Sequence, residues 1–233
     1  MRIGFGLLLV MATSMAFPLL GEAAAEKEGT VPPLFNPKGE EMNKTAPDQF
    51  QARFETSKGE FVIDVHRDWA PNGADRFFNL VRNGFFDDAR FFRVIAGFMV
   101  QFGINGDPKI TGAWSSATIP DDPVKQGNGR GQVTFAKTGQ PNSRSTQLFI
   151  NFQDNSRLDS QGFASFGQVI QGMDIVDKLY SGYGEGAPSG RGPDQNLLKA
   201  QGNEYLKAKF PELDYIKKAA ILEEPISAEA AKN

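Results

Sequence analysis

Two polar side chains interrupt an apolar stretch of twelve residues, Phe91–Phe102, which reads FFRVIAGFMVQF. Nine of the twelve residues are apolar, one is glycine, and the polar pair is Arg93 and Gln101. A bend is expected at Gly97, which divides the stretch into two strands. The alternation of side chains along a strand puts Arg93 on the same face as Phe91 and Ile95 in the first strand, and Gln101 on the same face as Met99 in the second. An unpaired buried guanidinium is costly, so Arg93 either pairs, reaches solvent past its apolar stem, or faces a cleft that receives a polar group.

The composition excludes several kinds of chemistry. The chain has 233 residues, no cysteine and a single histidine, His66. Disulfides, thiolate zinc sites and cysteine nucleophiles are therefore excluded, and a catalytic triad or a His-based metal site has almost nothing to draw on. We interpret His66, in an expected strand, as a surface or core residue. The 25 basic and 28 acidic residues give a net charge of −3, without the basic surplus that nucleic-acid binding favours.

The stretch around Arg93 resembles the signature of a known family. Residues 93–103 read RVIAGFMVQFG and resemble the motif F-H-R-[VI]-I-P-G-F-M-x-Q-G-G of the cyclophilin-type peptidyl-prolyl isomerases. The residues that match and would belong to the active site are Arg93, Phe98, Met99 and Gln101. Three positions depart from the motif: Phe92 stands where the family has His, Ala96 where it has Pro, and Phe102 where it has Gly.

A second segment, about 40 residues further on, resembles the same family. Residues 130–151, RGQVTFAKTGQPNSRSTQLFIN, resemble its second signature in the form seen in short bacterial members. Leu158-Asp159 and the run 163–169 then resemble a further strand of the family, and residues 172–177 its second helix. The resemblance extends from Gln49 to about Gly182. Two core strands joined by a polar loop would explain the second segment alone, but not both signatures at family spacing.

The resemblance implies a fold, an activity and a set of site residues. The fold is mainly β, an eight-stranded antiparallel barrel capped by two helices, and the activity is cis-trans isomerisation of X-Pro bonds in polypeptides, with no cofactor and no metal. Arg93 would be the catalytic donor and Gln101 would fix its guanidinium. Phe163 would lie at the rim of the pocket, near Arg157, where the family commonly has a His and a Trp. The residues expected to bind the substrate are Phe98, Met99, Gln101, Ala136, Lys137, Gln147, Phe149, Leu158 and Phe163.

The N-terminal residues have the pattern of an export signal. Arg2 precedes an uncharged run of 19 residues, 3–21, and the run is followed by Ala23-Ala24-Ala25. We expect cleavage after Ala25 and export to the periplasm or the extracellular space, with no stable membrane insertion afterwards, although the uncut run could span a bilayer. Residues 26–48 are rich in Glu, Lys, Pro and Gly, which predicts a flexible arm.

The remaining pattern places the elements of one domain, residues 49–222. Alternating apolar residues predict a hairpin at 50–65, and Ala70-Pro71 opens a helix that ends at Asn83-Gly84. Residues 106–129 are expected to be an irregular and functional loop. Asp194 is the expected N-cap of an inserted helix, residues 194–210, before the last strand at 213–222. The tail, residues 223–233, is expected to be disordered.

Two other functions fit the same sequence. The first is a binding module of the same fold, a chaperone or scaffold that holds Pro-containing segments with little turnover. Because binding alone needs only the apolar socket, the presence of both Arg93 and Gln101 favours the enzyme. The second is a structural envelope protein in which the arm and the inserted helix carry the function. We expect a monomer that acts on proline-containing polypeptides, assists the folding of exported proteins, and has no nucleic-acid partner.

Overall fold

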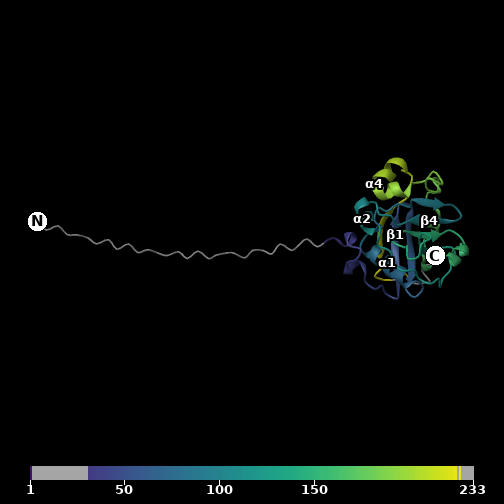
Figure 1. The fold of residues 1–233 in the computed structure, drawn as a ribbon, viewed down its shortest axis with the longest axis horizontal. Helices are drawn as coiled ribbons and strands as arrows, with labels where there is room; N and C mark the ends of the chain where they lie inside the picture. The colour runs from purple at the N-terminus through teal and green to yellow at the C-terminus, as the bar shows by residue number, and fades with distance from the viewer. Residues whose placement is uncertain (2–30, 225, 227–233) are drawn as a thin grey trace. The chain divides into compact units, whose positions relative to one another are not determined.

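The computed structural model describes residue 1, residues 31–224 and residue 226. The described residues from Val31 onward form one compact unit (Figure 1). The expected signal, residues 1–25, lies outside the described residues apart from Met1, as do the first part of the arm and most of the tail. Within the described part of the chain, no helix combines the length and apolarity needed to cross a bilayer.

Eight antiparallel strands form one sheet in the order β3-β4-β6-β5-β7-β2-β1-β8, which confirms the expected barrel-type fold. Hydrogen bonds where the two edge strands begin connect the segments that lead into them: the Phe91 N–H donates to Asp214 O at 3.0 Å and the Ile216 N–H to Ala89 O at 2.9 Å. The strands are β1 Gln49–Thr56, β2 Gly59–His66, β3 Arg93–Ile95, β4 Met99–Phe102, β5 Gln132–Phe135, β6 Leu148–Asn151, β7 Ser165–Gln171 and β8 Ile216–Ile221.

Phenylalanine rings fill the interior of the sheet. Phe54 and Phe61, neighbours across the β1–β2 hairpin, stack with centroids 5.1 Å apart, and both are fully buried. Phe102, one of the departures from the family motif, packs edge-on against Phe54 and is also fully buried. A large ring at this position therefore belongs to the core, where aromatic contacts add to the free energy of area burial.

Two helices pack on the sheet as expected. Helix α1, Pro71–Arg82, contacts β7 and β8, and the short α3, Met173–Asp177, contacts β2. Pro71 occupies the first turn of α1, where its missing N–H is not needed. Phe77, Leu80 and Val81 form the buried stripe of this helix.

The segment 106–129 is not irregular throughout, because it contains the unexpected helix α2, Pro108–Trp114. Its start has an ordinary cause: Asp107 caps it by accepting from the Lys109 N–H at 2.8 Å, and Pro108 takes the first position. Arg76 on α1 holds the end of α2, with its guanidinium 4.9 Å from the Trp114 ring and Nη1 donating to Ala117 O at 2.6 Å. Burial lowers the pKa of Arg76 to about 10, so it remains charged at neutral pH.

The described part of the expected arm is ordered against the domain, which corrects the prediction of a flexible linker for residues 31–48. Two 3-10 turns, Pro33–Phe35 and Glu40–Met42, lie in this segment, and Met42 is 1% exposed. The Trp114 Nε1–H donates to Leu34 O at 2.8 Å. The Glu, Lys, Pro and Gly content suggested a linker, but a few separate apolar residues are enough to dock the segment.

The inserted helix is present as α4, Gln195–Lys209, directly before β8. Asp194 caps it as expected, since its Oδ1 accepts from the Asn196 N–H at 2.7 Å. Helix α4 is kinked at Gly202, which has φ 60° and ψ −144°. A Cβ there would collide with Gly106 O, so glycine lets α4 approach the segment before α2.

The beginning of the tail follows β1 rather than leaving the domain. Gln51 of β1 accepts from the Ile226 N–H at 2.6 Å and donates to Ile226 O at 3.1 Å. The expected disorder is therefore wrong for the start of the tail, and residues 227–233 lie outside the described residues.

Candidate active site

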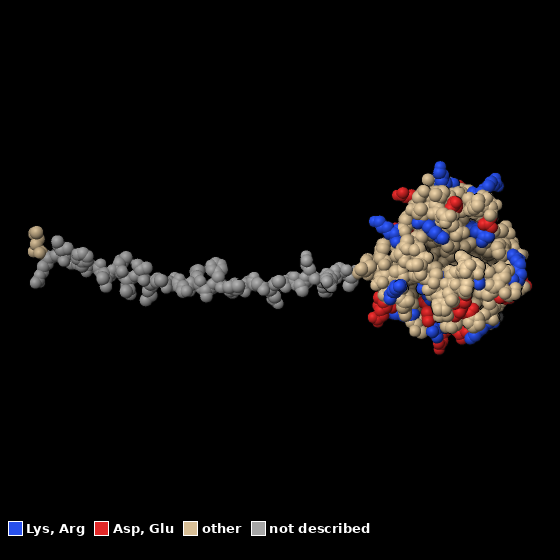
Figure 2. All heavy atoms as spheres, viewed as in Figure 1, with Lys and Arg blue, Asp and Glu red and all other residues tan. Residues whose placement is uncertain are grey.

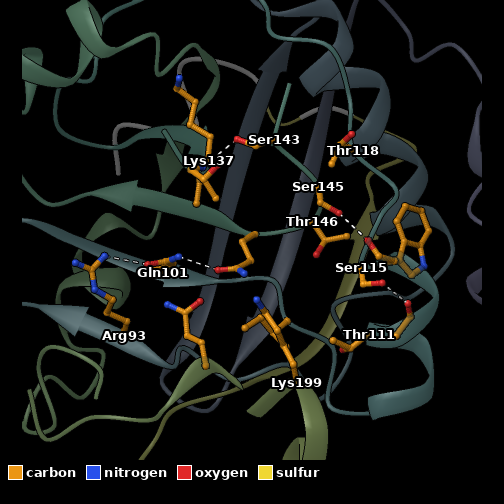
Figure 3. A pocket seen from close by; sticks show the side chains of 17 residues that line it. Arg93, Gln101, Thr111, Ser115, Thr118, Lys137, Ser143, Ser145, Thr146 and Lys199 are labelled. Carbon is orange, nitrogen blue, oxygen red and sulfur yellow. Dashed lines mark hydrogen bonds between the residues drawn. The ribbon is translucent and has the colours of Figure 1, made fainter. Parts of the chain in front are cut away.

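Strands β3 and β4 place Arg93 and Gln101 side by side. The two strands are joined by a tight turn in which Gly97 has φ 67°, and the register pairs Arg93 directly with Gln101. Arg93 Nη1 donates to Gln101 Oε1 at 3.0 Å, and Gln101 Nε2 donates to Gln147 Oε1 at 2.9 Å (Figure 3). Gln101 therefore contacts the guanidinium, and its role in fixing Arg93 stays a prediction.

Arg93 has a second partner that the sequence did not reveal. Arg93 Nε and Nη2 each donate to one carboxylate oxygen of Glu185 at 2.6 Å. The Gly186 N–H donates to Glu185 Oε1 at 2.8 Å. The hydrogen bonds from Arg93, aided by that from Gly186 and opposed by partial burial, lower the pKa of Glu185, so the group is a carboxylate at neutral pH.

The expected proline socket is a separate apolar cluster beside Arg93. Its buried members are Met99, Phe149 and Leu158, and Ile95, Phe98, Ala136 and Phe163 pack against them partly exposed. Arg93 Nη1 lies 3.9 Å from Met99 Sδ, so the guanidinium borders this cluster directly. The structure thus brings together the expected apolar contact residues, although their roles toward a substrate stay predictions.

Hydrogen bonds from asparagine side chains hold the turn that carries Phe98, one of the socket residues. Asn155 Nδ2 donates to Phe98 O at 2.8 Å and to Asn151 Oδ1 at 2.8 Å. The Phe152 N–H also donates to Phe98 O, at 3.0 Å. The turn that carries Phe98 is therefore tied to β6 and to the segment after it, which fixes the shape of the socket.

The rim of the socket is charged as well as aromatic. The Arg157 guanidinium lies 4.9 Å from the centroid of the Phe98 ring. Lys137 Nζ lies 5.6 Å from the Phe163 ring, which itself packs edge-on against Phe149 with centroids 5.7 Å apart. Arg157 and Phe163 thus each contact a ring of the socket, Phe98 and Phe149 respectively.

A cavity of about 530 Å³ extends from Arg93 and Gln101 toward α2 and α4. Figure 3 shows Lys199 of α4 and the hydroxyl groups of Ser145 and Thr146 around it. Gln147, Ala136 and Lys137 line it too, but Glu185 does not. The inserted helix therefore completes a wall of the cleft, and the family motifs gave no signal for Lys199 because they end before the insertion.

Charges of both signs are scattered over the visible face of the domain (Figure 2). The single histidine, His66, lies at the end of β2, stacks on Trp69 with centroids 4.2 Å apart, and has its Nε2 2.8 Å from Asp64 Oδ2. It is half-buried and outside the lining of the cleft. The charged side chains described at the site and its rim are therefore Arg93, Glu185, Arg157, Lys137 and Lys199.

Comparison with known proteins assigns the family. The family model described as cyclophilin type peptidyl-prolyl cis-trans isomerase/CLD matches residues 51–197, more than half of the chain. The chain therefore belongs to the cyclophilin-type peptidyl-prolyl cis-trans isomerases and is an isomerase by class. The match ends inside α4, so the family model does not cover most of the insertion.

Curated relatives carry the same activity in their names. Peptidyl-prolyl cis-trans isomerase B of Escherichia coli (strain K12) is 35% identical over 160 residues, 63% of this chain and 91% of that protein. A peptidyl-prolyl cis-trans isomerase of Acinetobacter baylyi is 36% identical over 137 residues, 53% of this chain and 68% of that protein.

Solved structures show the same fold. A cyclophilin from Hirschia baltica superposes with a TM-score of 0.55 at 18% identity, covering 82% of this chain and 79% of that one. A cyclophilin-type isomerase from Cryptosporidium parvum gives a TM-score of 0.57 at 20% identity, covering 76% and 99%. At these identities the likeness concerns the fold alone.

Proposed function

We propose that this isomerase acts on X-Pro bonds of polypeptides, with Arg93 as the catalytic donor. The observation that carries the proposal is the position of Arg93, whose guanidinium is fixed by hydrogen bonds and borders the apolar cluster of Met99, Phe149 and Leu158. A proline ring is apolar, and its nitrogen can accept a hydrogen bond only when the amide twists and the lone pair is no longer delocalised. An apolar socket beside a fixed cation matches both properties.

The reaction needs selective binding of the twisted amide rather than covalent chemistry. Rotation about the X-Pro bond crosses a barrier of about 18–20 kcal/mol, because the amide loses its resonance. In the twisted state the prolyl nitrogen becomes pyramidal and regains a lone pair. A donor aimed at that nitrogen therefore stabilises the twisted state and not the planar one, which is the condition for catalysis.

The size of one such interaction is sufficient to matter. A hydrogen bond from a charged donor contributes about 1.5–3 kcal/mol. This free energy corresponds to a rate factor of roughly 10 to 150. A thousandfold acceleration requires about 4 kcal/mol, so one such hydrogen bond supplies a large share of it. Gln101 contributes indirectly by holding Nη1, and the apolar cluster keeps water away from the reacting bond.

The test is the substitution Arg93→Ala. We expect kcat/KM on a short Pro-containing peptide to fall roughly 10- to 150-fold, the factor estimated for one charged hydrogen bond. Peptide affinity should change little, because Arg93 acts mainly on the twisted state. The isomerisation rate is measured by NMR exchange and the affinity by titration.

The same experiment separates the enzyme from the binding module. A parent protein that binds Pro-containing peptides without accelerating their isomerisation would be a scaffold or chaperone of this fold. Equal kcat/KM in the parent and in Arg93→Ala would show that the catalytic group lies elsewhere. The exposed ion pair of Arg130 and Asp177 provides a matched control, since Arg130→Ala removes a guanidinium outside the cleft.

Export is a further part of the proposal. The uncharged run 3–21 and the Ala23-Ala24-Ala25 site support removal of residues 1–25 and release of a monomeric isomerase outside the cytoplasm, where it assists the folding of exported proteins. The mass of the protein isolated from its host tests this part.

A further inference from the structure

Glu185 is the one carboxylate among the described residues that contacts the proposed catalytic arginine. Both of its oxygens accept hydrogen bonds from Arg93 at 2.6 Å, in the bidentate geometry that gives strong and directional ion pairs. The Arg93 side chain is 23% exposed and that of Glu185 39%. Arg93 is therefore the better shielded partner, while Glu185 is about as exposed as Asp177 in its pair with Arg130.

The loop that carries Glu185 is folded tightly around its backbone. The Gly192 N–H donates to Glu185 O at 2.8 Å, and the Gly190 N–H donates to Gly186 O at 3.0 Å. A Cβ at Gly190 would collide with the Glu185 carbonyl oxygen, and one at Gly192 would come within 2.9 Å of it. Only glycine allows this close approach, so the sequence GEGAPSGRG at 184–192 is suited to holding Glu185 in one place.

Both ends of the loop are attached to the insertion. Before the loop, the Tyr183 ring packs edge-on against Phe210 at the end of α4, with centroids 5.0 Å apart. After it, the Asp194 N–H donates to the Tyr205 hydroxyl oxygen at 3.1 Å, and Asp194 caps α4. Glu185 is therefore presented by a loop anchored on a helix rather than by a free surface segment.

The insertion also packs against the residue next to Arg93. Phe92, where the family motif has His, is 1% exposed and belongs to a small core formed with residues of the insertion. The other buried members of this core are Ile104, Leu198, Leu206 and Leu213. The insertion therefore packs against Phe92, the chain neighbour of Arg93, and also anchors the loop that carries Glu185.

We infer that Glu185 is a positioning residue that holds the Nε–Nη2 edge of Arg93 while Gln101 holds Nη1. This inference rests on the proposed function. Within the described residues, one N–H of Nη2 has no acceptor, because Nη2 carries two N–H groups and Glu185 takes one. That group is then available to the twisted amide in a fixed direction, and positioning of this kind is a major source of catalysis.

The test compares Glu185→Gln and Glu185→Ala in the full chain, in the parent and in an Arg93→Ala background. Both substitutions should lower kcat/KM on a Pro-containing peptide about tenfold in the parent, since the guanidinium loses its fixed orientation. The loss should appear in kcat, with KM nearly unchanged. In the Arg93→Ala background the same substitutions should have no further effect, because Glu185 acts through Arg93.

The control is Asp177→Ala, which removes the acceptor of another bidentate pair, Arg130 with Asp177, outside the cleft. It should leave kcat/KM unchanged. Equal losses in both backgrounds would show a merely structural effect of Glu185, and higher activity in Glu185→Gln would show that the carboxylate obstructs the substrate. Either result overturns the inference. If Arg93→Ala alone retains full activity, the proposed function fails first and the positioning role fails with it.

Discussion

Phe92 shows how one residue can couple the active site to the insertion. The Phe92→Ala change should destabilise the domain by about 3–5 kcal/mol, the usual cost of removing a buried ring, because the small core cannot close the cavity. The loss should be concentrated in α4. Urea unfolding measures the free energy, and hydrogen exchange of the backbone amides of residues 195–209 measures the local effect.

The control is Phe92→Leu, which keeps most of the volume and should cost clearly less. Unchanged exchange protection in α4 after Phe92→Ala would contradict the coupling, whatever the effect on global stability. Lower isomerase activity in parallel with lost protection in α4 would also fit the attachment of the Glu185 loop to this helix.

Single residues of the site differ in how far the sequence could predict them. Arg93 and Gln101 are eight positions apart on two strands joined by a tight turn, so their contact follows from local alternation and a bend at Gly97. Glu185 is 92 residues away from Arg93. Nothing local distinguishes it from the other acidic residues of the chain, and only the glycine-rich loop around it offered a signal.

Among the elements, the segment before β1 invites a direct test. A chain that begins at Gln49 should be less stable than one that begins at Val31, by about 2.5–6 kcal/mol. The estimate combines the exposure of apolar surface on removal of Met42, about 1.5–3 kcal/mol, with the loss of the acceptor of the buried Trp114 N–H, about 1–3 kcal/mol. The urea midpoints of the two chains provide the comparison.

A point substitution separates the two contributions of this segment. Met42→Ala in the longer chain removes the apolar contact and keeps the hydrogen bond from Trp114 to Leu34 O. It should cause part of the loss seen on truncation. Identical midpoints for the chains beginning at Val31 and Gln49 would mean that the segment docks without contributing to stability.

The elements that the sequence missed have a common cause. Helix α2 is seven residues long and lies among prolines and glycines, and the two 3-10 turns before β1 have three residues each. Segments this short show no apolar periodicity, and tertiary contacts such as those of Trp114 determine them. The long strands, α1 and α4 showed their periodicity or their caps in the sequence and were predicted.

At the scale of the whole molecule, the insertion extends the family fold in a specific direction. The sheet follows the family, whereas α4 and the loop before it add a wall to the cleft and a partner for Arg93. The barrel could be predicted because two motifs fixed its alignment with a known family. The placement of the insertion over the site could not be predicted, because it depends on long-range packing such as the small core that unites Phe92 with Leu198 and Leu206 of α4.

We expect the N-terminal residues to determine where this enzyme works. If residues 1–25 are removed, five residues, 26–30, precede the compact unit that begins at Val31, and the enzyme is released. If the run 3–21 is kept, it is long enough to hold the enzyme at a membrane.

We expect mass spectrometry of the protein from its native host to give a chain that begins near Glu26, because small residues at 23–25 suit a signal peptidase. Recovery of the intact N-terminus in the membrane fraction, together with isomerase activity, would show a permanent anchor instead. A substitution of Ala23 and Ala25 by bulky residues should block cleavage and move the activity to the membrane fraction. The same change at Ala24 leaves both small residues of the A-x-A pattern in place and serves as the control for processing.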